Sequence, residues 1–206
     1  ALHAAAGEGH LDVVRALLEA GGEELAMLKD KDGVSALHAA AGEGHLDVVR
    51  ALLEVGGKEV SGKELAMLTN NHGESALHSA AEFGNPDMVR ALLEAGGEEL
   101  AMLTNNDGES ALHLAANYAH LGVVQALLEV GKEGLAMLTN NDGESALHLA
   151  AKHAHLGVVQ ALLEVGKEGL AILQDKKHRT ALFIATWNPD KNFKVAEALR
   201  KVKDNG

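Results

Sequence analysis

Apolar positions recur along the chain with the spacing of an amphipathic helix. In the stretch HLDVVRALLEV at 45–55, Leu46 and the residues three, six and seven places after it are apolar and fall on one helical face. A shorter Ala/Leu-rich stretch comes before each such helix, and a Ser stands at its N-cap position, at Ser35, Ser75, Ser110 and Ser145. Each block therefore predicts two helices joined by a turn. We expect Gly56 or its equivalent to end the second helix, after which ELAMLTNNDG leaves the helix and closes in an Asn-Asp-Gly turn.

The same block recurs along the whole chain. The tag Ala-Leu-His begins at residues 1, 36, 76, 111 and 146, and Ala-Leu-Phe begins at 181, so the successive steps are 35, 40, 35, 35 and 35 residues. One helix pair cannot bury its apolar face alone, so this period indicates stacked repeats. We expect an all-α helical solenoid of about six helix-turn-helix repeats, in a single repeat domain over 1–206. The expected repeats are 1–31, 32–71, 72–106, 107–141, 142–176 and 177–206, the last one being a C-terminal cap.

The repeated block resembles the ankyrin repeat. DGVSALHAAAGEGHLDVVRALLEVG is similar to the pattern D-x-x-G-x-T-P-L-H-x-A-A-x-x-G-H-x-x-V-V-x-x-L-L-x-x-G, and the likeness recurs in phase over essentially the whole chain. The chain departs from the pattern by Ser-Ala in place of Thr-Pro, by a period of 35 residues and not 33, and by His178 and Phe183 in the last repeat. The resemblance implies an ankyrin-type solenoid with short β-hairpin-like fingers. It also implies hydrogen bonds within and between repeats from the histidines of the Leu-His position, His38, His78, His113 and His148.

The charge is strongly acidic and unevenly distributed. The chain has a net charge of −12, but the tail from Gln174 to Gly206 has eight Lys or Arg against four Asp or Glu. The acidic body would repel phosphate backbones and attract a basic or amphipathic partner, so we expect no nucleic-acid ligand. Acidic helix faces that merely keep the protein soluble are the alternative. No apolar run has the length of a membrane span, and the lack of cysteine favours an intracellular protein.

Sequence patterns that could indicate catalysis or metal binding fail on inspection. GKEVSGKE at Gly57–Glu64 approaches a phosphate loop, but Glu64 stands where the Mg²⁺-binding hydroxyl is required, so we interpret it as a surface insertion. An EF-hand register at TNNDGES would place Leu103 and Leu114 at calcium-ligand positions. The serines and histidines are explained by their places in the repeat. We therefore expect no enzyme, no cofactor and no metal site.

Two repeats differ at only two adjacent positions, which locates a candidate binding strip. From Asp107 and Asp142, thirty residues agree except at positions 117/152 and 118/153. The resemblance implies that these positions close the first helix and face the concave groove. Three of the five Phe, Tyr and Trp residues fall at the second position. The predicted partner-binding strip is Glu43, Glu82, Phe83, Asn117, Tyr118, Lys152, His153 and Trp187, with the rings as anchors. Rings that only shield helix ends, or a recent duplication, are the alternatives.

These patterns favour a non-catalytic protein–protein interaction module that binds a partner protein or peptide on its concave face. The fingertips, at 29–34, 69–74, 104–109, 139–144 and 174–179, form a second candidate surface. An engineered or structural repeat array, or a spacer fragment of a larger protein, is the alternative function. We expect a monomer. The first repeat has the sequence of an internal repeat, so we also expect further repeats before Ala1 or end-to-end self-association there.

Overall fold

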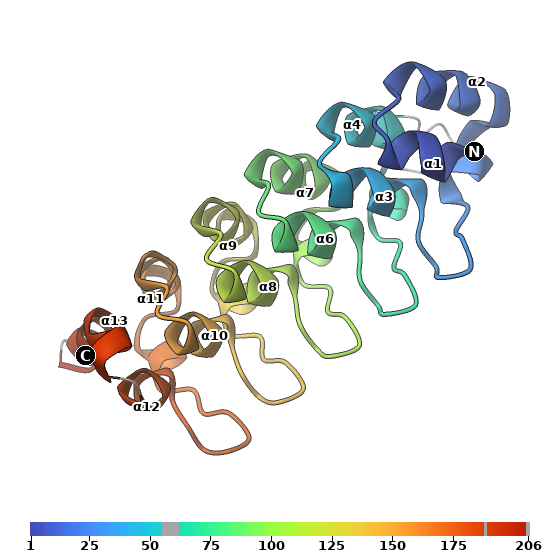
Figure 1. The fold of residues 1–206 in the computed structure, drawn as a ribbon. Helices are drawn as coiled ribbons and strands as arrows, with labels where there is room; N and C mark the ends of the chain where they lie inside the picture. Colours follow the sequence, from blue (N-terminus) through green and yellow to red (C-terminus); the bar gives the residue numbers. More distant parts are fainter. Residues whose placement is uncertain (55–61, 188, 205–206) are drawn as a thin grey trace. The chain divides into compact units, whose positions relative to one another are not determined.

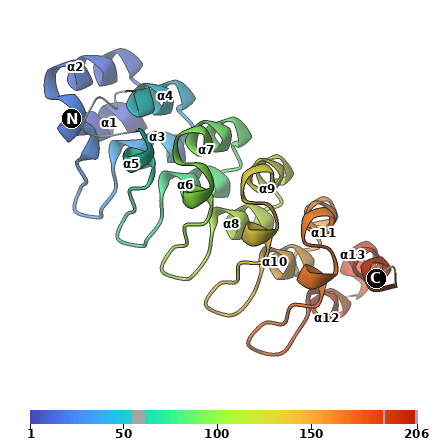
Figure 2. The ribbon, with the colours of Figure 1, turned by 180° about the vertical axis from the view of Figure 1, so that it is seen from behind.

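The computed structural model describes residues 1–54, 62–187 and 189–204, which fall into two compact parts, Ala1–Asn106 and Asp107–Gly206 (Figure 1). In both parts a short helix alternates with a longer one, and a finger leads to the next short helix (Figure 2). The N-terminal part contains α1 (Leu2–Gly7), α2 (Leu11–Met27), α3 (Ala36–Glu43), α4 (Leu46–Glu54), α5 (Gly62–Ala66), α6 (Ala76–Glu82) and α7 (Pro86–Ala101). The C-terminal part contains α8 (Ala111–Asn117), α9 (Leu121–Ala136), α10 (Ala146–Lys152), α11 (Leu156–Ala171), α12 (Ala181–Thr186) and α13 (Pro189–Asp204).

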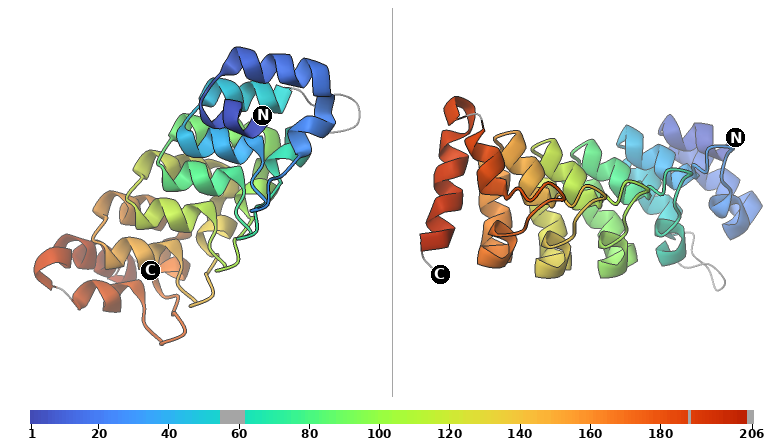
Figure 3. Two further views of the ribbon diagram at one scale, coloured as in Figure 1. Left: turned by 45° about the vertical axis from the view of Figure 1, so that its right-hand side comes forward. Right: turned by 90° about the horizontal axis from the view of Figure 1, so that it is seen from below.

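The helices of each part pack in two rows, which confirms the predicted all-α architecture (Figure 3). In the N-terminal part α1, α3 and α6 form the row of short helices, and α2, α4 and α7 form the row of long ones. The corresponding rows of the C-terminal part are α8, α10 and α12, and α9, α11 and α13. Leucines and alanines fill the interior: Leu37, Leu77, Leu112 and Leu147 are all 0% exposed. Small Ala side chains let neighbouring helices approach closely, so the core needs few rings.

A Ser and a His together begin most of the short helices. Ser35 caps α3, and its Oγ lies 2.7 Å from Nδ1 of His38 while its backbone N–H donates to the same nitrogen. The same capping box occurs at Ser75, Ser110 and Ser145, each with the His three residues later. The predicted Ser N-caps are confirmed. In addition, the His side chain accepts from the N-cap backbone N–H, a role that Glu or Gln usually has in a capping box.

The long helices continue beyond the glycine at which the sequence predicts their end. α7 breaks at Gly97, where φ is 61° and ψ is −153°, and then resumes as far as Ala101. The prediction that the ELAM segment leaves the helix is therefore wrong. The extra turn forms because Leu100 and Ala101 are both 0% exposed, and burying them offsets the cost of the break. The predicted insertion at Gly57–Glu64 lies outside the described residues as far as residue 61, and α5 begins at Gly62.

Each finger is held by a side chain that accepts hydrogen bonds from its own backbone. Oδ1 of Asn70 accepts from the N–H groups of His72 and Glu74, at 2.9 and 3.0 Å. The equivalent Asp30, Asn140 and Asp175 accept in the same way. Isolated antiparallel bridges such as Thr69 with Ser75 close the fingers, which confirms the hairpin-like form.

Neighbouring fingers are joined to one another by backbone hydrogen bonds. Within the N-terminal part the N–H of Asn71 donates to the carbonyl of Asp32 at 3.0 Å, and within the C-terminal part that of Asn141 donates to Asp107 at 2.8 Å. Gly33 has φ of 76°, and a Cβ on it would lie 2.7 Å from Oδ1 of Asn71. Glycine is therefore required there both by conformation and by the close approach of the next finger.

Two lysines hold backbone conformations that glycine adopts at equivalent positions. Lys132 and Lys167 have φ of 47° and 45°, whereas the equivalent residues of other repeats are Gly22 and Gly97. A side chain there costs about 1–2 kcal/mol. We expect K132G and K167G each to raise the free energy of unfolding by about 1 kcal/mol, measured by urea denaturation followed by circular dichroism.

The reciprocal variant G97K provides the control. No atom lies within 4 Å of a Cβ built on Gly97, so the backbone conformation alone should decide its effect. We expect G97K to lower the free energy of unfolding by about 1 kcal/mol. A loss of stability in K132G, as is usual for glycine inside a helix, would contradict the backbone assignment.

Candidate binding surfaces

In the N-terminal part, the strip residues lie at the C-terminal ends of short helices. Glu43 and Glu82 are the last residues of α3 and α6, and Phe83 is the C-cap of α6. All three are exposed, and Phe83 is 65% exposed. Its ring approaches the neighbouring repeat, because a Cβ built on Gly42 would lie 3.8 Å from its Cε2. The ring therefore borders the neighbouring repeat while most of it stays exposed.

The strip residues of the C-terminal part occupy the same helix ends. Asn117 and Lys152 end α8 and α10, and Tyr118 and His153 follow them as C-caps. Tyr118 is 50% exposed and Lys152 is exposed, whereas His153 is half-buried and stacks on another ring. The position of Asn117 also has a structural role, because its carbonyl accepts a hydrogen bond from Nε2 of His155 at 3.0 Å.

Trp187 is the most exposed aromatic side chain among the described residues. It is the C-cap of α12 and is 75% exposed. Its ring meets Phe183 edge to face, with the ring centroids 5.8 Å apart. Such pairs stabilise by about 0.5–1.5 kcal/mol beyond the area they bury, so the pair holds the indole in place while leaving most of it open.

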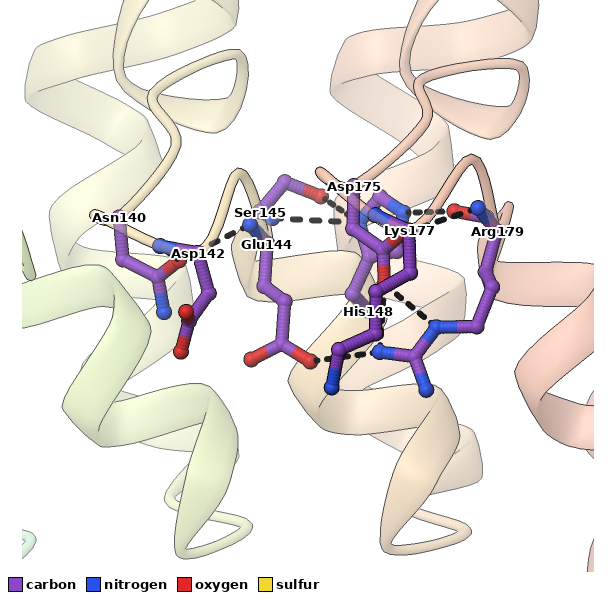
Figure 4. Close-up of polar contacts among 8 residues, drawn as sticks. All are labelled: Asn140, Asp142, Glu144, Ser145, His148, Asp175, Lys177 and Arg179. Atoms are coloured by element: carbon purple, nitrogen blue, oxygen red, sulfur yellow. Dashed lines mark hydrogen bonds and ion pairs between the residues drawn. The ribbon is translucent and has the colours of Figure 1, made fainter.

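Sequence reasoning missed an ion pair within the last finger that also reaches the preceding finger (Figure 4). Asp175 is 4% exposed, and Nε of Arg179 donates to its Oδ2 at 2.6 Å. The guanidinium also lies 3.5 Å from a carboxylate oxygen of Glu144 in the preceding finger. Burial raises the pKa of Asp175, but the hydrogen bonds from Arg179 and from the backbone N–H of Lys177 outweigh it and hold the pKa below its usual range. The signal in the sequence was the change from Asn140 and Glu144 to Asp175 and Arg179.

A cleft of about 400 Å³ lies in the C-terminal part and joins the two candidate surfaces. Lys152 and Trp187 of the strip line it together with finger residues, and Asn192 of α13 lies against it. The described residues that line it are Asp142, Glu144, Lys152, Lys177, Arg179, Ile184, Trp187 and Asn192. Asn192 is 3% exposed, and its Oδ1 has no hydrogen-bond partner among the described residues. The sequence predicted the strip and the fingertips separately, and the structure brings them together here.

The residues that the structure describes contain no cluster of three or more His, Cys, Asp or Glu that could hold a metal ion. Over the same residues, no helix is both long enough and apolar enough to span a membrane.

Three of the buried histidines connect their repeat to the finger that follows it within the same part. Nε2 of His38 lies 2.9 Å from the carbonyl of Glu74, and Nε2 of His148 lies 3.0 Å from that of Arg179. The backbone N–H of the Ser already donates to Nδ1, so the proton of the neutral ring is on Nε2. The bonds that the resemblance implied are thus present, within the repeat at all four positions and between repeats at His38, His113 and His148.

Comparison with known proteins gives one consistent result. A sequence model described as Ankyrin repeats (3 copies) matches residues 1–64, 60–137 and 132–205. No curated protein matches the chain. Among solved structures, the crystal structure of EF0377, an ankyrin repeat protein, is similar with a TM-score of 0.81 and 23% sequence identity. The match covers 98% of this chain and 96% of that one, and at this identity it concerns the fold alone.

The buried histidines should make stability depend on pH in a defined window. Burial lowers the pKa of His38 and His148, and the hydrogen bonds to the carbonyls of Glu74 and Arg179 only partly offset this effect. As the pH is lowered, these histidines therefore become protonated in the unfolded chain at a higher pH than in the folded protein. We expect these histidines to leave the free energy of unfolding at its highest value above about pH 7. The free energy should fall as the pH drops from about 6.5 toward the lower folded-state pKa values.

Two variants test this assignment by urea unfolding at several pH values. H148N should lower stability at pH 7.5 and make the decline between pH 7.5 and 5 shallower. H72N replaces an exposed histidine and should leave the decline unchanged. The lowered pKa values of Asp30 and Asp175 affect stability only below about pH 4, outside this window. An unchanged decline in H148N would contradict the role assigned to the buried ring.

Proposed function

Because the chain belongs to the ankyrin repeat family, whose members are generally protein–protein interaction modules, we propose that it is a non-catalytic module that binds a protein or peptide partner. The proposed binding surface is the concave face, where the short helices and the fingers lie. The proposal takes its general class from the family and its site from the surface features of this chain.

The exposed rings at the helix ends are the observation that carries the proposal. Phe83, Tyr118 and Trp187 are 65%, 50% and 75% exposed, in a chain with only 2% aromatic residues. Large rings on a surface are typical of binding hot spots, because they bury much area with few rotatable bonds. Each is placed by a helix C-cap, so the backbone that presents it is rigid.

A structural array or spacer without its own ligand is the second candidate, and one observation favours it. The rings make contacts within the chain: Tyr118 stacks on His120 with centroids 6.2 Å apart, and Trp187 packs on Phe183. Rings used in this way would shield helix ends from water. Both candidates place the same residues at the same sites, so only the effect of removing the rings distinguishes them.

Removing the three rings together tests the proposal. We expect F83A/Y118A/W187A to lower the free energy of unfolding by about 2–3 kcal/mol in total, because each ring buries only part of its area and two of them lose a ring contact. The same variant should lose a partner that the unchanged protein captures by pull-down. Measurements of urea unfolding and of capture on one preparation separate the two effects.

A matched control removes exposed apolar side chains elsewhere. V13A/I172A/F193A changes residues that are 49%, 58% and 63% exposed and lie outside the strip, and it should retain capture. A collapse of stability in the strip variant would show that the rings belong to the core. Equal capture by the strip variant and the unchanged protein would reject the strip as the binding surface.

A further inference from the structure

The cleft of the C-terminal part has a charge opposite to that of the equivalent place one repeat earlier. Five of its lining positions carry Asp142, Glu144, Lys152, Lys177 and Arg179, and the residues 35 positions earlier are Asp107, Glu109, Asn117, Asp142 and Glu144. The earlier set contains four carboxylates and no cation, whereas the cleft contains two carboxylates and three cations. The same scaffold therefore repels a carboxylate at one step and attracts it at the next.

Two of the three cations have charge available for a ligand. Arg179 is occupied by Asp175 and Glu144, which share its guanidinium. Lys152 and Lys177 are exposed, and neither has an ion-pair partner among the described residues. They come from the end of α10 and from the last finger, so they flank the cleft from two different elements.

The rest of the cleft offers an apolar surface. Trp187 and the buried Ile184 supply it. Asn192 lies against the cleft, and its Oδ1 is buried with no hydrogen-bond partner among the described residues. Asn192 is the fourth residue of α13, and the fourth residue of α11 is Val159, so the repeat itself does not require an amide at this place.

We propose that this cleft binds an acidic peptide segment of the partner protein. A carboxylate side chain lies between Lys152 and Lys177, and a neighbouring apolar side chain packs on Trp187. The volume of about 400 Å³ fits one or two side chains, at the lower end of ligand pockets. This inference rests on the proposed function and specifies the chemistry of its partner.

The chain has a built-in reporter, because Trp187 is its only tryptophan. Titration of the full chain with an acetylated and amidated hexapeptide of alternating Glu and Leu should change the fluorescence of Trp187 in a saturable way. The effect should weaken as salt rises, because the lysines are exposed. A hexapeptide of alternating Lys and Leu should give no saturable change, and neither should inorganic phosphate. Equal saturable responses to phosphate and to the Glu/Leu peptide would overturn the peptide assignment in favour of a general anion site.

Matched charge reversals test the two lysines. K152E/K177E should weaken binding of the Glu/Leu peptide at least tenfold, since each attraction becomes a repulsion. K132E/K167E makes the same charge change on α9 and α11, outside the cleft, and should leave the affinity unchanged. Equal affinity of both variants would overturn the assignment.

Failure of this inference can be told from failure of the proposed function. F83A/Y118A changes the strip outside the cleft, and its loss of partner capture supports the proposed function independently. If capture is lost there while the Glu/Leu peptide leaves Trp187 unaffected, the cleft proposal fails and the interaction module stands.

Discussion

A hydrogen bond from a buried histidine to the next finger is the interaction on which the stack of repeats depends. Nδ1 of His38 accepts from Ser35, while Nε2 donates to the carbonyl of Glu74, so one ring caps a helix and positions the following repeat. His113 and His148 do the same in the C-terminal part. A buried polar group left without a partner costs about 1–3 kcal/mol, so displacing a finger from its histidine would destabilise the fold by about this amount. The link fixes the register of neighbouring repeats more strictly than the apolar contacts between Ala and Leu, which tolerate small shifts.

Much of the fold could be predicted from the sequence because this link and the core repeat in phase. The Ser N-caps, the helix pairs and the fingers all depend on local residues at constant spacing. The extra turn after Gly97 could not be predicted from local signals, because it depends on the burial of Leu100 against other helices. The ion pair of Arg179 with Glu144 could not be predicted from local signals either, since its partners are 35 residues apart and only the stacking of fingers brings them together.

The candidate site was predicted in part for a related reason. The strip positions were found because they vary where the rest of the repeat does not. The structure places each at the last residue or the C-cap of a short helix, with an exposed side chain except at Asn117 and His153. The cleft was not predicted, because Asn192 lies on α13, whose sequence no longer follows the repeat. Variation within a repeat shows where packing leaves a side chain free, but not which free side chains meet.

The backbone nature of the histidine link explains how one end of the array could acquire a different charge. The acceptor is a carbonyl, so any side chain can stand at that residue, and the chain has Val34, Glu74, Glu144 and Arg179 there. Changing Glu to Arg at the last of these positions leaves the link intact. The fold therefore does not determine the charge of the fingers. The new arginine is accommodated by Asp175, which replaces the Asn of the three middle fingers and keeps the same two backbone hydrogen bonds. That compensation accounts for Arg179 but not for Lys152 or Lys177, whose charges stabilise no described contact. Neither packing nor the link requires these two lysines, and the proposed acidic segment would account for their charge on an acidic chain.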